Sequence, residues 1–266
     1  MSGLAGDLLR LAEGAGAILV EHYGRLHRGD ARRKQGRRRD LVSRADLESQ
    51  AFLLERIPTQ DDVLAEEGNS RETGAKRRWI VDPLDGTINY LHGLPFWCVS
   101  IAVIEEGALE AGVVHAPALG QTFLAVRGRG ATLDGEPVAV SRTAAIEDAV
   151  LATGFAYRRN ELEDKNFDNF TRLGLAAAGV RRMGSAALDL AYVACGRLDG
   201  FWELHLNAWD LAAGALLVRE AGGEVTDFSG SQALDDLLFR RHLVASNGLL
   251  HEAVRTRLAP LRGLEA

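Results

Sequence analysis

The twelve residues Trp79–Tyr90 constrain this chain more than any other stretch. They begin as an apolar run of strand type and continue as Asp82-Pro83-Leu84-Asp85-Gly86-Thr87. Proline favours an extended conformation at the residue before it, and glycine allows a ligand to approach the backbone closely. Two carboxylates beside a Gly-Thr turn can hold hard cations, and the N–H groups of the turn can face a phosphate. A strand followed by an ordinary Asx-type turn is the alternative that this stretch alone leaves open.

Two further blocks carry matching acids. Glu66-Glu67-Gly68 follows a short apolar run, and residues 209–223 read Trp-Asp-Leu-Ala-Ala-Gly-Ala-Leu-Leu-Val-Arg-Glu-Ala-Gly-Gly. Together the three blocks resemble the inositol monophosphatase family, part of a wider group of Mg²⁺-dependent, lithium-sensitive phosphatases that includes fructose-1,6-bisphosphatases. The order of the blocks is that of the family, and Tyr90 stands where phenylalanine is usual.

The composition is that of an ordinary soluble globular protein. The 266 residues are 47% hydrophobic and 26% charged, which is enough chain to bury a large core. We expect one domain over residues 1–266, or two intimate halves of 1–145 and 146–266. The net charge of −6 argues against a nucleic-acid binder overall. The chain shows no signal segment or apolar run of membrane-span length, so a cytoplasmic location is expected.

The spacing of apolar residues predicts the secondary structure. A helix is expected over 4–23, and another over 47–57 with Asp46 as its N-cap. Residues 96–139 alternate as an antiparallel meander, in which 128–135 are expected to be turns. Strands and helices then alternate to the end, which indicates an α+β or layered α/β fold. The family resemblance sharpens this class to an alternating αβαβα sandwich.

The resemblance implies a site for two or three Mg²⁺ ions. One ion would take Glu66, Asp82 and the backbone carbonyl of Leu84. A second would take Asp82, Asp85 and Asp210, and a third, weaker site would use Glu66 and waters. Mg²⁺ prefers such oxygen ligands, and the chain supplies no Cys/His cluster suited to Zn²⁺.

The resemblance also implies how the reaction would run. The attacking water would lie near Glu66 and Thr87, with Asp46 hydrogen-bonded to Thr87. The N–H groups of Gly86 and Thr87 would hold the phosphate. Glu67 is placed behind Glu66, since neighbouring side chains of an extended chain face opposite ways.

The implied reaction is hydrolysis of inositol 1-phosphate by direct attack of a metal-activated water, in a homodimer. The substrate would contact Glu203, Gly184, Ser185 and Ala186, with Glu203 facing the ring hydroxyls. Fructose-1,6-bisphosphatase, histidinol-phosphate phosphatase and 3′-phosphoadenosine nucleotidase activities are the enzymatic alternatives. His92, His115 and His205 are expected to be structural or surface residues, and Cys98 and Cys195 to be structural thiols rather than a disulfide.

A basic tract over residues 27–39 holds seven lysines and arginines. It can be a solvated loop or hairpin, an electrostatic funnel for a phosphorylated substrate, or a contact for RNA or an acidic protein through Arg32–Arg39. The resemblance implies a hairpin here that lies beside the active site and carries a lysine, for which Lys34 is the nearest candidate.

Overall fold

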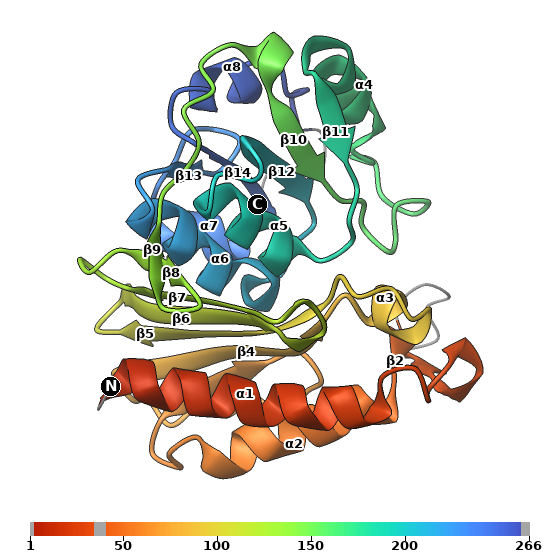
Figure 1. Cartoon of the computed structure of the whole chain (residues 1–266), viewed down its shortest axis with the longest axis vertical. Coiled ribbons are helices and arrows are strands. Elements are labelled where there is room, and N and C mark those ends of the chain that lie inside the picture. Colours follow the sequence, from red (N-terminus) through yellow and green to blue (C-terminus); the bar gives the residue numbers. More distant parts are fainter. Residues whose placement is uncertain (1–2, 35–40, 262–266) are drawn as a thin grey trace.

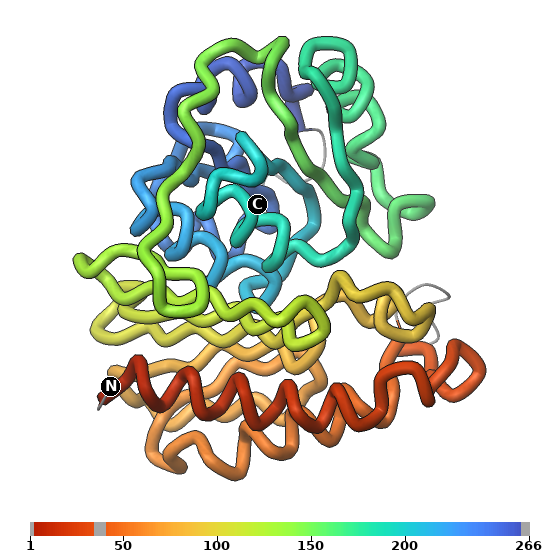
Figure 2. Tube along the Cα trace, in the orientation of Figure 1, coloured from red at the N-terminus to blue at the C-terminus, as the bar shows by residue number. Residues whose placement is uncertain are grey.

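The structure is a computed structural model that describes residues 3–34 and 41–261. Five layers alternate between helices and sheets (Figure 1). The chain fills the lower layers first and the upper layers afterwards (Figure 2). The predicted αβαβα sandwich is therefore confirmed, whereas the division into one domain or two halves stays a prediction. No helix of the described residues is long and apolar enough to span a membrane.

The two outer helices of the lower half cover one face of a seven-stranded sheet. These helices are α1 (Leu4–His22) and α2 (Arg44–Arg56). The strands follow the chain in order as β3 (Asp62–Ala65), β4 (Arg77–Asp85), β5 (Cys98–Glu105), β6 (Ala108–Ala116), β7 (Gln121–Val126), β8 (Ala131–Leu133) and β9 (Glu136–Val138). Only the pair β3–β4 is parallel; every later pair of neighbours is antiparallel, as the meander predicts. The expectation that 128–135 are turns is wrong in part, because β8 fits between two short turns.

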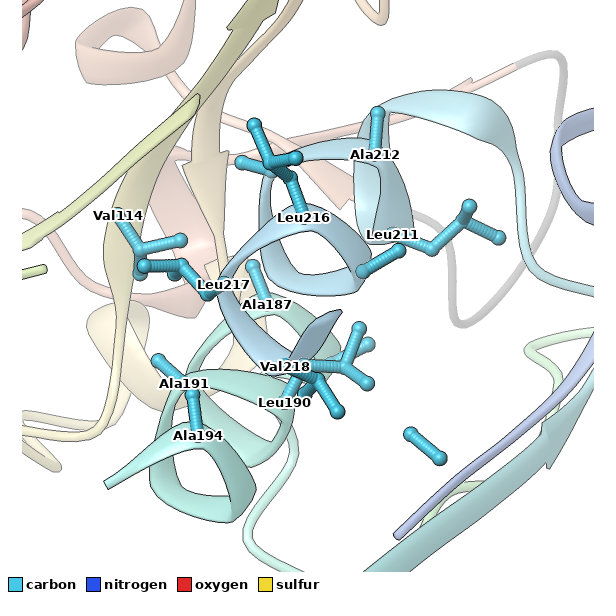
Figure 3. Close-up of a cluster of buried hydrophobic side chains, with 14 of the residues drawn as sticks. Val114, Ala187, Leu190, Ala191, Ala194, Leu211, Ala212, Leu216, Leu217 and Val218 are labelled. Atoms are coloured by element: carbon cyan, nitrogen blue, oxygen red, sulfur yellow. The ribbon is translucent and has the colours of Figure 1, made fainter. Parts of the chain in front are cut away.

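In the middle layer, the two longer helices are apolar nearly all round, because both of their sides face a sheet. This layer contains α5 (Ala186–Ala194), α6 (Ala208–Glu220) and α7 (Leu234–Phe239). In Figure 3, Leu190 of α5 and Val218 of α6 lie in one buried cluster, which Val114 of β6 reaches from the lower sheet. A Cβ on Gly214 would lie 2.5 Å from the Cβ of Leu190, so glycine is required for the close approach of α5 and α6.

The upper sheet has five strands in the order β11-β10-β12-β14-β13. Their bounds are β10 (Val150–Thr153), β11 (Gly179–Arg181), β12 (Gly200–Leu204), β13 (Glu224–Thr226) and β14 (His242–Ser246). The helices α4 (Phe167–Ala176) and α8 (His251–Arg255) form the outermost layer (Figure 1). β10 runs parallel to both of its neighbours, while β14 is antiparallel to β12 and β13. The expected alternation of strand and helix is thus present, with α7 as an unpredicted addition.

Short elements complete the chain. The first part of the basic tract contains a 3₁₀ turn, η1 (Arg28–Asp30), and β1 (Arg32–Arg33), which pairs antiparallel with β2 (Leu41–Val42). Two more 3₁₀ turns are η3 (Pro117–Leu119) and η4 (Ile146–Asp148). Residues 35–40 lie outside the described residues, so the structure describes only part of the tract for which an RNA or protein contact is expected.

Candidate active site

One cavity of about 420 Å³ brings the predicted site residues together. It is lined from the ends of β3 and β4, from the first turns of α5 and α6, and from β12 and the loop after β10. Its lining includes Glu66, Asp82, Leu84, Asp85, Gly86, Thr87, Gly184, Ser185, Ala186, Glu203 and Asp210. Of the predicted set, Asp46 alone is not part of the lining, and it lies behind Thr87. Segments more than 100 residues apart in the chain therefore share one site.

The end of β4 places the first carboxylates. The pairing of β4 with β5 shifts register between Asp82 and Asp85, where Pro83 cannot donate a backbone hydrogen bond. The Asp82 Oδ1 atom accepts from the Leu84 N–H at 3.0 Å, which orients this carboxylate. Gly86 has a φ of 94°, and a Cβ there would lie 3.0 Å from the Phe96 carbonyl oxygen. The turn that leads into α3 (Thr87–Leu91) therefore needs glycine.

The helix α3 is anchored to α1 through Tyr90. Its hydroxyl donates to the Leu19 carbonyl oxygen at 2.6 Å, and its ring packs edge-on against Trp97. Tyrosine in place of the usual phenylalanine thus adds a buried hydrogen bond that fixes the turn to the first layer of the fold.

Asp85 and Asp210 are each held by the first turn of a helix. The Asp85 Oδ2 atom accepts from Ser185 Oγ at 2.7 Å and from the Ala187 N–H at 2.8 Å, which joins β4 to α5. Asp210 Oδ2 accepts from the Asn207 N–H at 2.6 Å in a capping box. Asn207 is the N-cap of α6, and Asp210 is its third residue. Both carboxylates gain from the helix dipole.

Thr87 and Asp46 form the predicted pair. The Thr87 hydroxyl lies 3.1 Å from Asp46 Oδ1 and 3.2 Å from the Leu84 carbonyl oxygen. Asp46 Oδ2 accepts from the Ser43 N–H at 2.9 Å and from Ser43 Oγ at 2.6 Å. The prediction of Asp46 as an N-cap is wrong: Ser43 caps α2, and Asp46 is the acidic partner of the capping box. Burial raises the pKa of Asp46 to about 6, against the hydrogen bonds from Ser43.

Glu66 and Glu67 were expected to face opposite ways, and this is wrong because β3 ends at Ala65 and the chain turns at Glu66. Lys34 Nζ lies 2.6 Å from one oxygen of each glutamate. Burial opposes the charge of Lys34, yet Glu66 and Glu67 raise its pKa well above the ordinary value. Glu66 lines the cavity and Glu67 does not, and Lys34 also lines the cavity, where the resemblance implies a lysine.

The acids of the site repel one another. Burial, and after it the charge of Glu66, raises the pKa of Asp82 and of Asp210 well above the usual range. Burial also raises the pKa of Asp85 to about 6. An all-oxygen set of carboxylates with a nearby backbone carbonyl fits Mg²⁺, whose charge would relieve this repulsion. Within the described residues, no group of three or more His, Cys, Asp or Glu side chains is arranged so that it could hold a metal ion.

Glu203 lines the cavity from β12. A Cβ on Gly154 would lie 2.1 Å from Glu203 Oε2, so the carboxyl group occupies the space beside this glycine. Burial raises the pKa of Glu203 to about 8, although Arg182 opposes the shift. The predicted pocket residues Gly184, Ser185 and Ala186 form the entry to α5 beside it.

Several cavity residues were not predicted from the sequence. They include Phe155, Tyr157, Arg158, Arg182, Asp189 and Arg241, and His205 joins them although it was expected to be structural or on the surface. Asp189 follows Ser185 by four residues, and this helical spacing was a signal that could have found it. Of the other histidines, His115 bonds Thr122 Oγ1 at 2.9 Å and His92 is exposed. Cys98 and Cys195 are free thiols, as predicted.

Comparison with known proteins decides the family. Residues 6–261 match the model of the inositol monophosphatase family. The chain belongs to this family. A Pseudomonas aeruginosa relative named Nus factor SuhB is 42% identical over 263 residues, which are 95% of this chain and 94% of the relative. A Thermotoga maritima relative named fructose-1,6-bisphosphatase/inositol-1-monophosphatase is 39% identical over 254 residues, 92% of each chain.

The solved structures agree with this assignment. The structure of an inositol monophosphatase from Anabaena is 36% identical, covers 95% of this chain and 94% of its own, and superposes with a TM-score of 0.83. Family membership indicates a phosphatase that acts on a small phosphorylated substrate, and the family is generally metal-dependent.

Proposed function

We propose that this protein is a Mg²⁺-dependent phosphatase of small polyol phosphates, with inositol 1-phosphate as its substrate. The observation that supports this most is the single cavity in which Glu66, Asp82, Asp85 and Asp210 meet the Gly86–Thr87 turn. These four acids and the Leu84 carbonyl would hold two or three Mg²⁺ ions. Bound Mg²⁺ would neutralise the phosphate, activate an attacking water and stabilise the leaving alkoxide.

The residues of the chain would then position the reactants. The N–H groups of Gly86 and Thr87 would donate to phosphate oxygens, beside the start of α3. Near Glu66, the Thr87 hydroxyl would accept a hydrogen bond from the attacking water and take its proton while passing its own proton to Asp46. Glu203 and the Gly184–Ala186 entry to α5 would contact the polyol.

The test is phosphate release from a panel of esters in Mg²⁺ and in EDTA. The panel contains inositol 1-phosphate, fructose 1,6-bisphosphate, histidinol phosphate and 3′-phosphoadenosine 5′-phosphate. We expect the highest kcat/KM with inositol 1-phosphate, complete loss in EDTA and recovery with Mg²⁺. A higher kcat/KM with another ester would change only the substrate that we propose. Full turnover in metal-free buffer would contradict the proposed mechanism.

We propose three further properties, two of which follow from membership of the family. We propose a homodimer, which light scattering would detect, and inhibition by Li⁺. A second role as a regulator is favoured by the relative named Nus factor SuhB and by the basic residues of β1. Such a role would add to catalysis, since the complete acid set supports a working active site.

A further inference from the structure

Asp189 is a buried acid in the cavity wall that the proposed hydrolysis does not use. It lies in the first turn of α5, and only 1% of its surface is exposed. It lines the same cavity as the four candidate metal ligands and Glu203. Among the residues that the structure describes, none gives a hydrogen bond to its Oδ1 atom.

An unpaired buried carboxyl oxygen is unfavourable, because folding removes it from water without a replacement partner. Such an atom points to a ligand when it borders a cavity that the ligand enters. If this position served only to pack α5 against its neighbours, an apolar side chain could be buried there at a lower free-energy cost. The oxygen of Asp189 is therefore a candidate acceptor for a substrate group.

The neighbours of Asp189 define which group this would be. Glu203 is the charged residue that acts most strongly on Asp189, followed by Asp85 and Arg182. Arg182 lies across the entry to α5, where a Cβ on Gly184 would be 2.4 Å from its Nη1 atom. Ser185, one turn before Asp189 on the same helix, bonds Asp85. Asp189 thus lines the same cavity as Asp85 and Glu203 and is close enough to both for their charges to act on it.

We propose that Asp189 is a specificity-determining residue that accepts a hydrogen bond from a substrate hydroxyl beside the one bound by Glu203. This inference rests on the proposed function. Two acceptors on two different elements, α5 and β12, suit two hydroxyls on neighbouring carbons of a polyol. An ester without hydroxyls would leave both buried acceptors unpaired. Sites of this kind discriminate strongly against substrates that lack the hydrogen-bonding group.

The test compares two esters in two variants. We expect Asp189→Ala to lower the ratio of kcat/KM for inositol 1-phosphate to that for p-nitrophenyl phosphate about tenfold or more, mainly through KM. Asp189→Asn keeps an acceptor oxygen and should recover most of the ratio. Asp235→Ala, at an exposed acid in the first turn of α7, is the matched control and should leave the ratio unchanged.

Two results would overturn the inference: an unchanged ratio in Asp189→Ala, or equal losses on both esters together with a lower melting temperature. The second result would make Asp189 a structural residue. Calorimetric binding of inositol 1-phosphate in Mg²⁺ separates this inference from the proposed function. A wild-type protein that binds the ester without hydrolysing it would refute only the phosphatase, and a weaker Kd in Asp189→Ala would still support the role of Asp189. Equal Kd values, or no binding by the wild type, would refute that role.

Discussion

At the scale of single residues, Thr87 is the residue of the turn after β4 whose side chain would take part in the proposed hydrolysis. Its hydroxyl lies between Asp46 Oδ1 and the Leu84 carbonyl, so its orientation is fixed before any substrate enters. Thr87→Val keeps the branched shape and removes this hydroxyl. We expect kcat to fall by roughly 10²–10⁴, the range for a positioned proton-transfer group, with a much smaller change in KM. Steady-state phosphate release measures both.

Thr87→Ser is the matched control, because it keeps the hydroxyl and should retain most of kcat. Near-wild-type turnover in Thr87→Val would show that Thr87 has only a structural role in the turn and none in proton transfer. Asp46→Asn is a poorer probe of the same pair. Both Asp46 oxygens accept hydrogen bonds, and an amide would turn a donor toward Ser43 or Thr87. This variant would therefore lose stability as well as activity, and the two effects could not be separated.

Short-range patterns allowed the sequence to predict most of the site. The acids and the Gly-Thr turn are local motifs, and the structure brings them to one cavity. What could not be predicted depends on packing between distant segments. The charge of Glu203 acts on Asp189 because α5 packs beside β12, and the contact of Lys34 with both glutamates depends on a turn at Glu66. Residue type alone does not specify either contact.

At the scale of elements, the ends were predicted less well than the elements themselves. Asp46 and Asp210 each follow a Ser or Asn by three residues, and either member of such a pair can be the N-cap. The strand β8 and the helix α7 are short, so their sequences carry few periods of an apolar pattern. These elements are stabilised by their neighbours in the sheet and the core.

The hairpin of β1 and β2 gives a prediction at this scale. Arg32 and Arg33 are exposed on β1, directly before Lys34, which lines the cavity. If their charge attracts the phosphate ester, the double variant Arg32→Gln/Arg33→Gln should lower kcat/KM roughly two- to fivefold at low salt and weaken its salt dependence. The kcat value should stay the same, because neither side chain is placed at the reacting atoms.

A matched control is Arg127→Gln/Arg129→Gln, which removes the same charge from an exposed loop between β7 and β8. Equal effects of the two double variants would refute the funnel and leave only a net-charge effect. If RNA or an acidic protein binds the hairpin, the Arg32/Arg33 variant should lose that binding while catalysis is unchanged.

At the scale of the whole molecule, the cavity combines acids from both sheets and from the helices between them, so its charge affects global stability. The pKa values of Asp85 and Asp46 are raised to about 6, and those of Glu67 and Glu203 to about 8, chiefly by burial. Each group binds protons more tightly in the folded protein than in the unfolded chain. Their contribution therefore lowers the free energy of unfolding as the pH rises from about 4 to the folded pKa values.

Mg²⁺ binds deprotonated carboxylates, so at its candidate ligands, of which Asp82 and Asp210 also have raised pKa values, it should offset the part of this penalty that they and Asp85 contribute and stabilise the folded protein more at pH 8 than at pH 6.5. We expect saturating Mg²⁺ to raise the melting temperature by roughly 5–10 °C over EDTA at pH 8, and by less at pH 6.5. Taking the difference at each pH cancels the buried histidines, whose lowered pKa values act in the opposite direction. Asp82→Asn removes a shared candidate ligand and should abolish most of the gain. An equal Mg²⁺ gain at both pH values, or a full gain in Asp82→Asn, would contradict a metal site built from these acids.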